Sequence, residues 1–144
     1  MIVFYGSDLT WAVKIKSTAE ALGIHARPAR SIDMLEARLA DSPPDPAMVA
    51  FIADLAEPEI ALSLIERVAD ENRRRSEKRE EELALGGSSG VADAKPRGMI
   101  QILAFGPHVE VDALQRARDL GAHEVMTRGA FSANLPDILV RLNG

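Results

Sequence analysis

The sequence predicts a doubly wound α/β fold built on a five-stranded parallel sheet in the order 2-1-3-4-5. Short apolar segments alternate five times with longer segments whose apolar residues recur at helical spacing. Strict alternation of this kind implies parallel strands joined by right-handed crossovers. The middle segment, 47–55, is apolar on both alternating faces, as in a strand covered by helices on both sides. The 144 residues are too few for an eight-unit barrel.

The first βα unit is a strand at 2–5 and a helix at 9–22. The strand is rich in β-branched and aromatic side chains, and the Gly-Ser-Asp segment after it predicts a turn. Apolar residues then recur at helical spacing until Gly23, where a helix would stop. Trp11 on this helix is expected to be partly buried in the core.

The second unit is a shorter strand at 24–29 and a helix that ends near Asp41. Ser31 stands where an N-cap belongs, directly before a stripe of apolar residues. The proline-rich segment 42–46 cannot continue the helix, because proline lacks the amide donor.

The third unit begins with the central strand, which places Asp54 at its carboxyl end. The helix after Pro58 carries an apolar stripe that fades into a charged stretch, 71–82, whose acids and bases nearly cancel. Because this composition favours helix, the third helix is predicted to project beyond the core. The Gly/Ser segment 86–90 must end it.

Residues 1–144 are interpreted as one domain, with about 71–98 forming a charged helix extension plus a flexible Gly/Ser-rich loop. Segment 86–90 lacks the Lys-Ser/Thr ending of a phosphate-binding loop. The arginine triplet 73–75 lies among glutamates that cancel its field, so a solvated or partner-facing helix is expected there.

The last two units follow the same pattern. A strand at 99–105 precedes a helix at 111–120, and Gly121 ends that helix. A short strand at 124–127 and a final helix at 135–142 complete the predicted fold.

Composition excludes several function classes. The chain is 47% hydrophobic and 27% charged with a net charge of -5, which is typical of a globular protein and gives no general attraction to nucleic acid. The absence of cysteine removes disulfides, thiolate catalysis and cysteine-ligated metal sites, and fits a reducing cytoplasm. No segment approaches the length of a membrane span, so no membrane partner is expected.

A doubly wound sheet binds ligands beyond the carboxyl ends of its strands, where the winding direction switches between the first and third strands. The residues that this rule brings to the candidate site are Gly6, Ser7, Asp8, Asp54, Gly106, His108 and Arg128.

Three segments resemble one known family. Asp-Leu-x-x-Pro at 54–58, Leu-Gly-Ala-x-x-x-Met-Thr at 120–127, and the spacing from Gly6 to Gly23 resemble the receiver domains of bacterial response regulators, over nearly the whole chain. The resemblance implies a flavodoxin-like, receiver-like fold and a role in two-component signal transduction. It also makes Asp54 the candidate phosphoacceptor.

The sequence departs from the family's pattern at the positions that carry its chemistry. The family holds magnesium with acids after the first strand, whereas Asp8 comes one position late here. The departing positions are Gly6 and Ser7 in place of those acids, Gly106 in place of a hydroxyl residue, Val125 in place of an aromatic switch residue, Arg128 in place of lysine, and Gly129 in place of proline. Since phosphoryl transfer depends on positive charge near the transferring oxygens, Asp54 is interpreted as a strand-end residue that forms a salt bridge with Arg128.

The leading hypothesis is therefore a stand-alone pseudo-receiver that acts by protein–protein interaction in the cytoplasm. It would have no enzymatic activity, no metal, no cofactor and no normal magnesium-dependent phosphorelay. Its partners would be signalling proteins, with a homodimer as a further option and with no nucleic acid. The resemblance implies docking on the fourth helix, fifth strand and fifth helix, and the long third helix with its loop is a second candidate face.

Two other classes remain open at this stage. An atypical response regulator could be phosphorylated on Asp54, with Asp8 and Glu57 completing an unusual cation site. A flavodoxin-like domain could instead bind a small molecule, or act on one, at the strand-end crevice. A Ser-His-Asp arrangement of Ser7, His108 and Asp54 lacks any nucleophile-elbow motif, and the histidine has no metal-ligand spacing.

Overall fold

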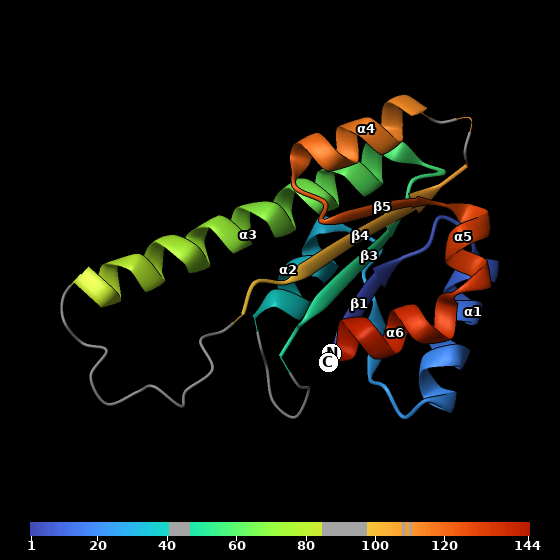
Figure 1. The fold of residues 1–144 in the computed structure, drawn as a ribbon, viewed down its shortest axis with the longest axis horizontal. Coiled ribbons are helices and arrows are strands. Elements are labelled where there is room, and N and C mark those ends of the chain that lie inside the picture. Colours follow the sequence, from blue (N-terminus) through green and yellow to red (C-terminus); the bar gives the residue numbers. More distant parts are fainter. Residues whose placement is uncertain (41–46, 85–97, 108, 110) are drawn as a thin grey trace.

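The computed structural model of the chain describes residues 1–40, 47–84, 98–107, 109 and 111–144. In this part of the chain, parallel strands form one sheet in the order β2-β1-β3-β4-β5 (Figure 1). The strands are β1 Ile2–Tyr5, β2 Ala26–Pro28, β3 Ala50–Asp54, β4 Gln101–Gly106 and β5 Glu124–Thr127. The predicted fold class and strand order are confirmed.

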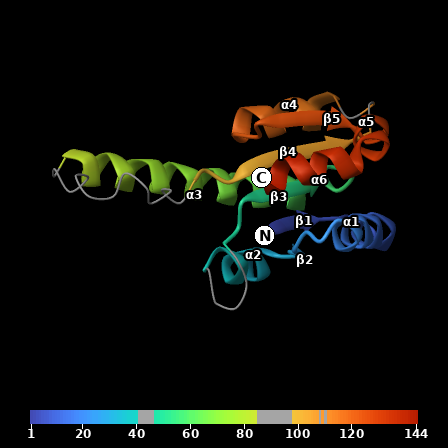
Figure 2. The same ribbon diagram turned by 60° about the horizontal axis from the view of Figure 1, so that its bottom comes forward.

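Helices cover both faces of the sheet. They are α1 Leu9–Ala21, α2 Ile32–Leu39, α3 Pro58–Ala84, α4 Val111–Leu120, α5 Arg128–Ala133 and α6 Leu135–Asn143. The buried residues of α1, α5 and α6 pack in one core cluster, and those of α2, α3 and α4 pack in a second cluster on the opposite face (Figure 2). This division is what doubly wound connections produce.

Strand side chains alternate between these two clusters. On β3, Phe51 faces the α2, α3 and α4 side, whereas Ile52 faces the α1, α5 and α6 side. Trp11 is only 8% exposed and packs against the rings of Phe105 and Phe131, which stack with centroids 4.0 Å apart. Trp11 is thus a core residue, which matches the interpretation favoured from the sequence.

Within the described ranges, side chains cap α1, α2 and α5 at their amino ends. An Asp8 carboxylate oxygen accepts from the Trp11 N–H at 3.0 Å, and the Ser31 hydroxyl oxygen accepts from the Met34 N–H at 3.2 Å. The second of these caps was predicted from the sequence. The third belongs to α5, where Thr127 is the N-cap.

The structure differs from the prediction in the helices that follow the fifth strand. The sequence predicts one helix after the fifth strand, whereas α5 begins directly at its end and precedes α6. The Thr127 hydroxyl oxygen accepts from the Ala130 N–H at 3.2 Å, which starts the helix. Phe131 is the one buried residue of α5, so no periodic apolar stripe reveals it. The predicted strand at 47–55 is also longer than β3, because its pairing with β1 starts at Ile2 opposite Ala50.

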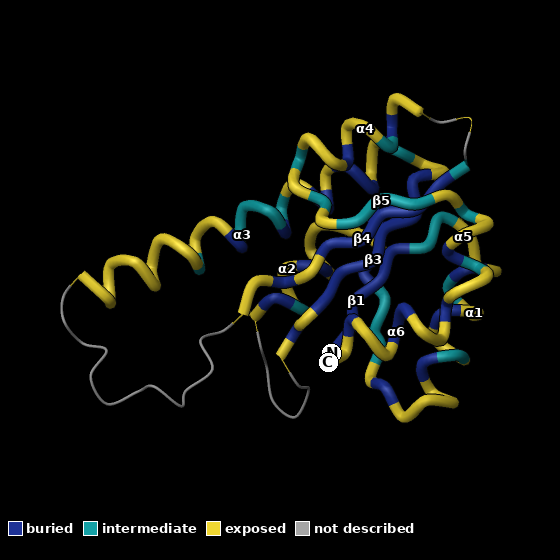
Figure 3. The backbone as a smooth tube through the Cα atoms, viewed as in Figure 1, coloured by how far each residue is buried: buried dark blue, intermediate teal, exposed yellow. Residues whose placement is uncertain are grey.

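The helix α3 is 27 residues long and extends well beyond the sheet (Figure 3). Its last buried residue is Asn72, and every residue from Ser76 to Ala84 is exposed. The side chain of Asn72 pairs with the backbone of Ile100: its amide donates to the Ile100 carbonyl at 2.9 Å, and its oxygen accepts from the Ile100 N–H at 2.7 Å. This pair ties the last buried turn of α3 to the segment entering β4. Most of the predicted loop after α3, residues 85–97, lies outside the described residues.

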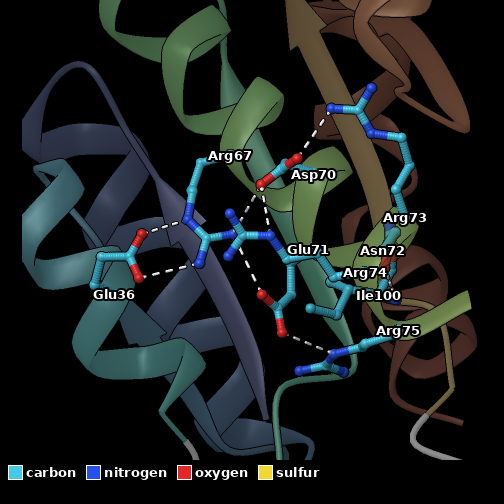
Figure 4. Close-up of polar contacts among 9 residues, drawn as sticks. All are labelled: Glu36, Arg67, Asp70, Glu71, Asn72, Arg73, Arg74, Arg75 and Ile100. Carbon is cyan, nitrogen blue, oxygen red and sulfur yellow. Dashed lines mark hydrogen bonds and ion pairs between the residues drawn. The ribbon is translucent and has the colours of Figure 1, made fainter. Parts of the chain in front are cut away.

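Ion pairs also join α3 to α2 (Figure 4). Arg67 donates to both carboxylate oxygens of Glu36 and also pairs with Glu71 at 3.3 Å. The hydrogen bond from Arg67 holds the pKa of Glu36 below its usual value, against the opposing effect of burial. Arg75 pairs with Glu71 at 3.3 Å. The charged stretch therefore begins as a network on the protein body and continues onto the projecting helix.

Candidate functional site

The residues after β1 and at the end of β3 meet because these strands are neighbours at the centre of the sheet. Asp54 is fully buried at the carboxyl end of β3. The Ser7 hydroxyl donates to Oδ2 of Asp54 at 2.6 Å, and the Ser7 N–H donates to the same oxygen at 3.3 Å. The Ala56 N–H donates to Oδ1 at 3.0 Å. Both carboxylate oxygens therefore accept hydrogen bonds from neighbouring chain segments.

The prediction of a salt bridge between Asp54 and Arg128 is wrong. Among the residues that the structure describes, the contacts of Asp54 are with neutral donors, and no ion pair joins it to Arg128. Arg128 is the first residue of α5, and its Nε is buried without a hydrogen-bond partner. The donors of the two adjacent segments give both carboxylate oxygens hydrogen bonds.

The two acids proposed for an unusual cation site are used elsewhere. The Asp8 side chain caps α1, and Glu57 accepts a hydrogen bond from the Tyr5 hydroxyl at 3.4 Å. No group of three or more His, Cys, Asp or Glu side chains in the described ranges is placed to hold a metal ion. The arrangement therefore favours a hydrogen-bonded carboxyl site.

Tyr5 connects Glu57 to the carboxyl site, because its hydroxyl donates to Glu57. Burial raises the pKa of the Tyr5 phenol above its ordinary value of 10.0, and the nearby charge of Glu57, the hydrogen bond to Glu57 and the charge of Asp54 raise it further. Below the ordinary pKa the phenol is neutral in the folded and unfolded states alike. As the pH rises through that value, Tyr5 loses its proton first in the unfolded chain, so the contribution of Tyr5 to the free energy of unfolding is lost progressively toward alkaline pH.

A spectrophotometric titration can test this environment, because Tyr5 is the single tyrosine of the chain. We expect Glu57→Gln to lower the pKa of Tyr5 toward its ordinary value, because the variant removes a negative charge that disfavours the phenolate. Glu59→Gln, an exposed acid in the first turn of α3 that does not act on Tyr5, is the matched control. Equal pKa values for Tyr5 in both variants would contradict the assignment.

Two glycines at the site leave little room for side chains. A Cβ on Gly6 would lie 3.2 Å from the Ala12 nitrogen, and a Cβ on Gly106 would lie 3.0 Å from the Leu55 Cβ. Any side chain at Gly106 would therefore press on the residue directly after Asp54. The packing around Asp54 depends on the small size of both positions.

A pocket adjoins this carboxyl site. Its volume is ≈ 330 Å³, and it is lined by Tyr5, Gly6, Ser7, Asp8, Leu9, Ala12 and Arg30. Tyr5 and Arg30 were not among the predicted site residues. Arg30 could have been found, since it follows β2 and the carboxyl ends of parallel strands share one edge.

The structure describes the remaining predicted positions except His108. Val125 is partly buried and packs against the core cluster on the α3 and α4 side. The structure thus brings Ser7 to Asp54, turns Asp8 toward α1, and places no hydroxyl at Gly106. His108 lies outside the described residues, so the Ser-His-Asp arrangement has no described geometry. Within the described ranges, no helix is both long enough and apolar enough to cross a bilayer.

The Ser7 hydroxyl should be important for stability. We expect Ser7→Ala to lower the free energy of unfolding by about 1–3 kcal/mol, because it removes the shortest hydrogen bond to a fully buried carboxylate. Ser63→Ala is the matched control, since its exposed hydroxyl donates to the Ile60 carbonyl at 2.9 Å. Urea unfolding of both variants measures the difference, and equal small losses would contradict the role assigned to Ser7.

Several solved structures that this chain is similar to are response regulators or their receiver domains. A response regulator from Thermotoga maritima matches with a TM-score of 0.62 at 13% identity, covering 98% of this chain and 94% of the other. The receiver domain of NtrX from Brucella abortus matches with a TM-score of 0.62 at 14% identity, covering 99% and 97%. The chemotaxis response regulator CheY4 of Vibrio cholerae gives 0.60 at 11% identity, covering 98% and 96%. No family model and no curated protein matches the sequence. The structural likeness establishes that the chain has the receiver fold.

Proposed function

We propose that this receiver-fold chain is a pseudo-receiver, a signalling module that works by docking onto protein partners without magnesium-dependent phosphoryl transfer at Asp54. The observation that carries the proposal is the enclosure of Asp54, which is fully buried with Ser7 and Ala56 donating to its two oxygens. The proposal includes no enzymatic activity of the chain's own, and a place in a bacterial, cytoplasmic two-component pathway with no nucleic-acid or membrane partner.

The surroundings of Asp54 oppose phosphoryl transfer for two reasons. An attacking carboxylate oxygen must reach the phosphorus in line with the leaving group, and here Oδ2 accepts from both the hydroxyl and the N–H of Ser7. Transfer also needs cationic charge at the equatorial oxygens, which magnesium usually supplies. In the described ranges, the acids nearest the site, Asp8 and Glu57, are bonded to other groups.

The two tightly packed glycines support the same proposal. The resemblance to receivers puts an acid at Gly6 and a hydroxyl residue at Gly106, yet a Cβ at either position would lie 3.2 Å or less from its neighbour. Restoring those side chains would require α1 or Leu55 to shift. This close packing supports the proposal, because the site holds no such side chain without a rearrangement.

Docking is the function that then remains for the scaffold. The resemblance implies a docking face on α4, β5 and the last helix, α6. Exposed apolar side chains on these helices, Val111 at 65% and Val140 at 55% exposure, are suited to a protein partner. The partner is expected to be a signalling protein.

Incubation with magnesium and acetyl phosphate, followed by intact mass measurement, tests the proposal. We expect the mass of the wild-type protein to stay unchanged, with the Thermotoga maritima response regulator run alongside as a reference protein of the same fold. A product heavier by one phosphoryl group that disappears in Asp54→Asn would instead identify an atypical response regulator phosphorylated on Asp54.

A further inference from the structure

The projecting part of α3, residues 73–84, carries opposite charges at its two ends. We call this segment the α3 arm. Its first seven residues contain Arg73, Arg74, Arg75, Lys78 and Arg79 against the single acid Glu77. The three residues 80–82 are all glutamates. At about 1.5 Å per residue the arm is roughly 18 Å long, and its charge changes from mainly basic over 73–79 to acidic over 80–82.

The basic end of the arm is only partly neutralised. The Asp70 carboxylate is shared by Arg73 at 3.1 Å and Arg74 at 3.2 Å, and Arg67 approaches it at 4.0 Å (Figure 4). This one carboxylate thus serves the two exposed guanidinium groups of Arg73 and Arg74, while Arg67 pairs with Glu36 and Glu71. The side chains of Arg73 and Arg74 remain 70% and 67% exposed, so their charge is presented to the surroundings.

The glutamates at the acidic end of the arm are not paired with a cation within the described residues. None of the residues 77–82 forms an ion pair there, and no basic residue lies in the last turn of α3. Carboxylates at the carboxyl end of a helix oppose its dipole, which is unfavourable. Because the arm also has no core packing beyond Asn72, a cationic partner surface at its tip would stabilise it.

We propose that the α3 arm pairs with the α3 arm of a second copy of this chain, in an antiparallel arrangement with two-fold symmetry. In this arrangement the glutamates 80–82 of each copy lie opposite the arginines 73–75 of the other, and Glu77 lies opposite Lys78. Every contact occurs twice, as a closed two-fold interface requires. A parallel arrangement would instead place like charges together at both ends.

One face of the helix supports this pairing. Ala69, Ser76 and Leu83 are spaced by seven residues and therefore lie on one face of α3. Ala69 and Ser76 line a groove of ≈ 400 Å³ at the base of the arm, together with Met99. Leu83 and Met99 are 54% and 56% exposed. Antiparallel pairing brings Leu83 of one copy to the level of Asn72 of the other, beside this groove, and buries both exposed side chains.

Charge reversal tests the pairing in the full chain. One variant combines Glu80→Lys, Glu81→Lys and Glu82→Lys, and the other combines Arg73→Glu and Arg74→Glu, while Arg75 is retained because it is 11% exposed and bonded to Glu71. Sedimentation velocity at about 10–100 µM should show a wild-type dimer that dissociates in high salt. Each variant alone should dimerise roughly tenfold to a hundredfold more weakly, and an equimolar mixture should restore the dimer.

Three results would overturn the proposal: a monomeric wild-type protein, variants that dimerise as well as the wild type, or a mixture that stays monomeric. Circular dichroism spectra that superimpose on the wild-type spectrum show that the variants are folded. Glu20→Lys, an exposed acid on α1, serves as the control for charge reversal away from the arm and should leave the dimer intact. The outcome is independent of phosphorylation at Asp54.

Discussion

Asn72→Ala is expected to lower the free energy of unfolding by about 2–5 kcal/mol, because it leaves two buried backbone groups without partners. Asn72 is 4% exposed and Ile100 is fully buried, so water cannot easily replace the lost bonds. The variant removes the acceptor of the Ile100 N–H and the donor to the Ile100 carbonyl in one step. It also detaches α3 from the segment that leads into β4. Chemical denaturation monitored by circular dichroism measures the loss.

Asn134→Ala provides the matched control for this prediction. The Asn134 side chain also donates to a backbone carbonyl, that of Ala130 at 2.9 Å, but in an exposed position. Its removal should cost no more than about 1 kcal/mol, since water can take over the bond. Similar losses in the two variants would show that the Asn72 pair does not anchor α3.

Gly121→Ala is expected to destabilise the protein by about 2–4 kcal/mol. Gly121 follows α4 and has a φ of 123°, a conformation that residues with a side chain rarely adopt. An added Cβ would also lie 2.9 Å from the Cβ of Ala69 on α3, which is closer than carbon atoms normally approach. The substitution therefore combines backbone strain with a steric conflict between two helices.

Gly23→Ala separates these two causes. Gly23 follows α1 with a φ of 71°, and a Cβ there would have no neighbour within 4 Å. This control retains the backbone strain and lacks the conflict, so its cost should be about 1–2 kcal/mol. Thermal unfolding of both variants gives the comparison. If Gly121→Ala cost no more than the control, the close packing of α4 on α3 would not be an important constraint.

Local sequence signals were sufficient to predict most of the elements. The strand β1, the helix α4 and the strand β5 occupy the predicted residues, since each is bounded by glycine or polar residues that stop the pattern. The Ser31 N-cap was visible for the same reason. Alternation of strands and helices then restricted the topology to the observed order.

The predictions from sequence that failed concern features that depend on tertiary contacts. The helix α5 buries only Phe131, so its sequence carries no periodic signal. The strand-end rule placed Ser7 and Asp54 together correctly. It could not show that the Ser7 hydroxyl and two backbone N–H groups would satisfy the carboxylate and leave Arg128 without a role there. Hydrogen-bond partners of a buried acid are set by distances of a few tenths of an ångström, which residue spacing does not encode.

A calorimetric titration of the wild-type protein with Mg²⁺ tests most directly whether the enclosed Asp54 lacks a cation site. The account predicts no saturable binding heat at millimolar Mg²⁺, because the carboxylate oxygens accept from Ser7 and Ala56, and Asp8 and Glu57 are bonded elsewhere. Saturable binding of one Mg²⁺ per chain that is lost in Asp54→Asn would contradict it.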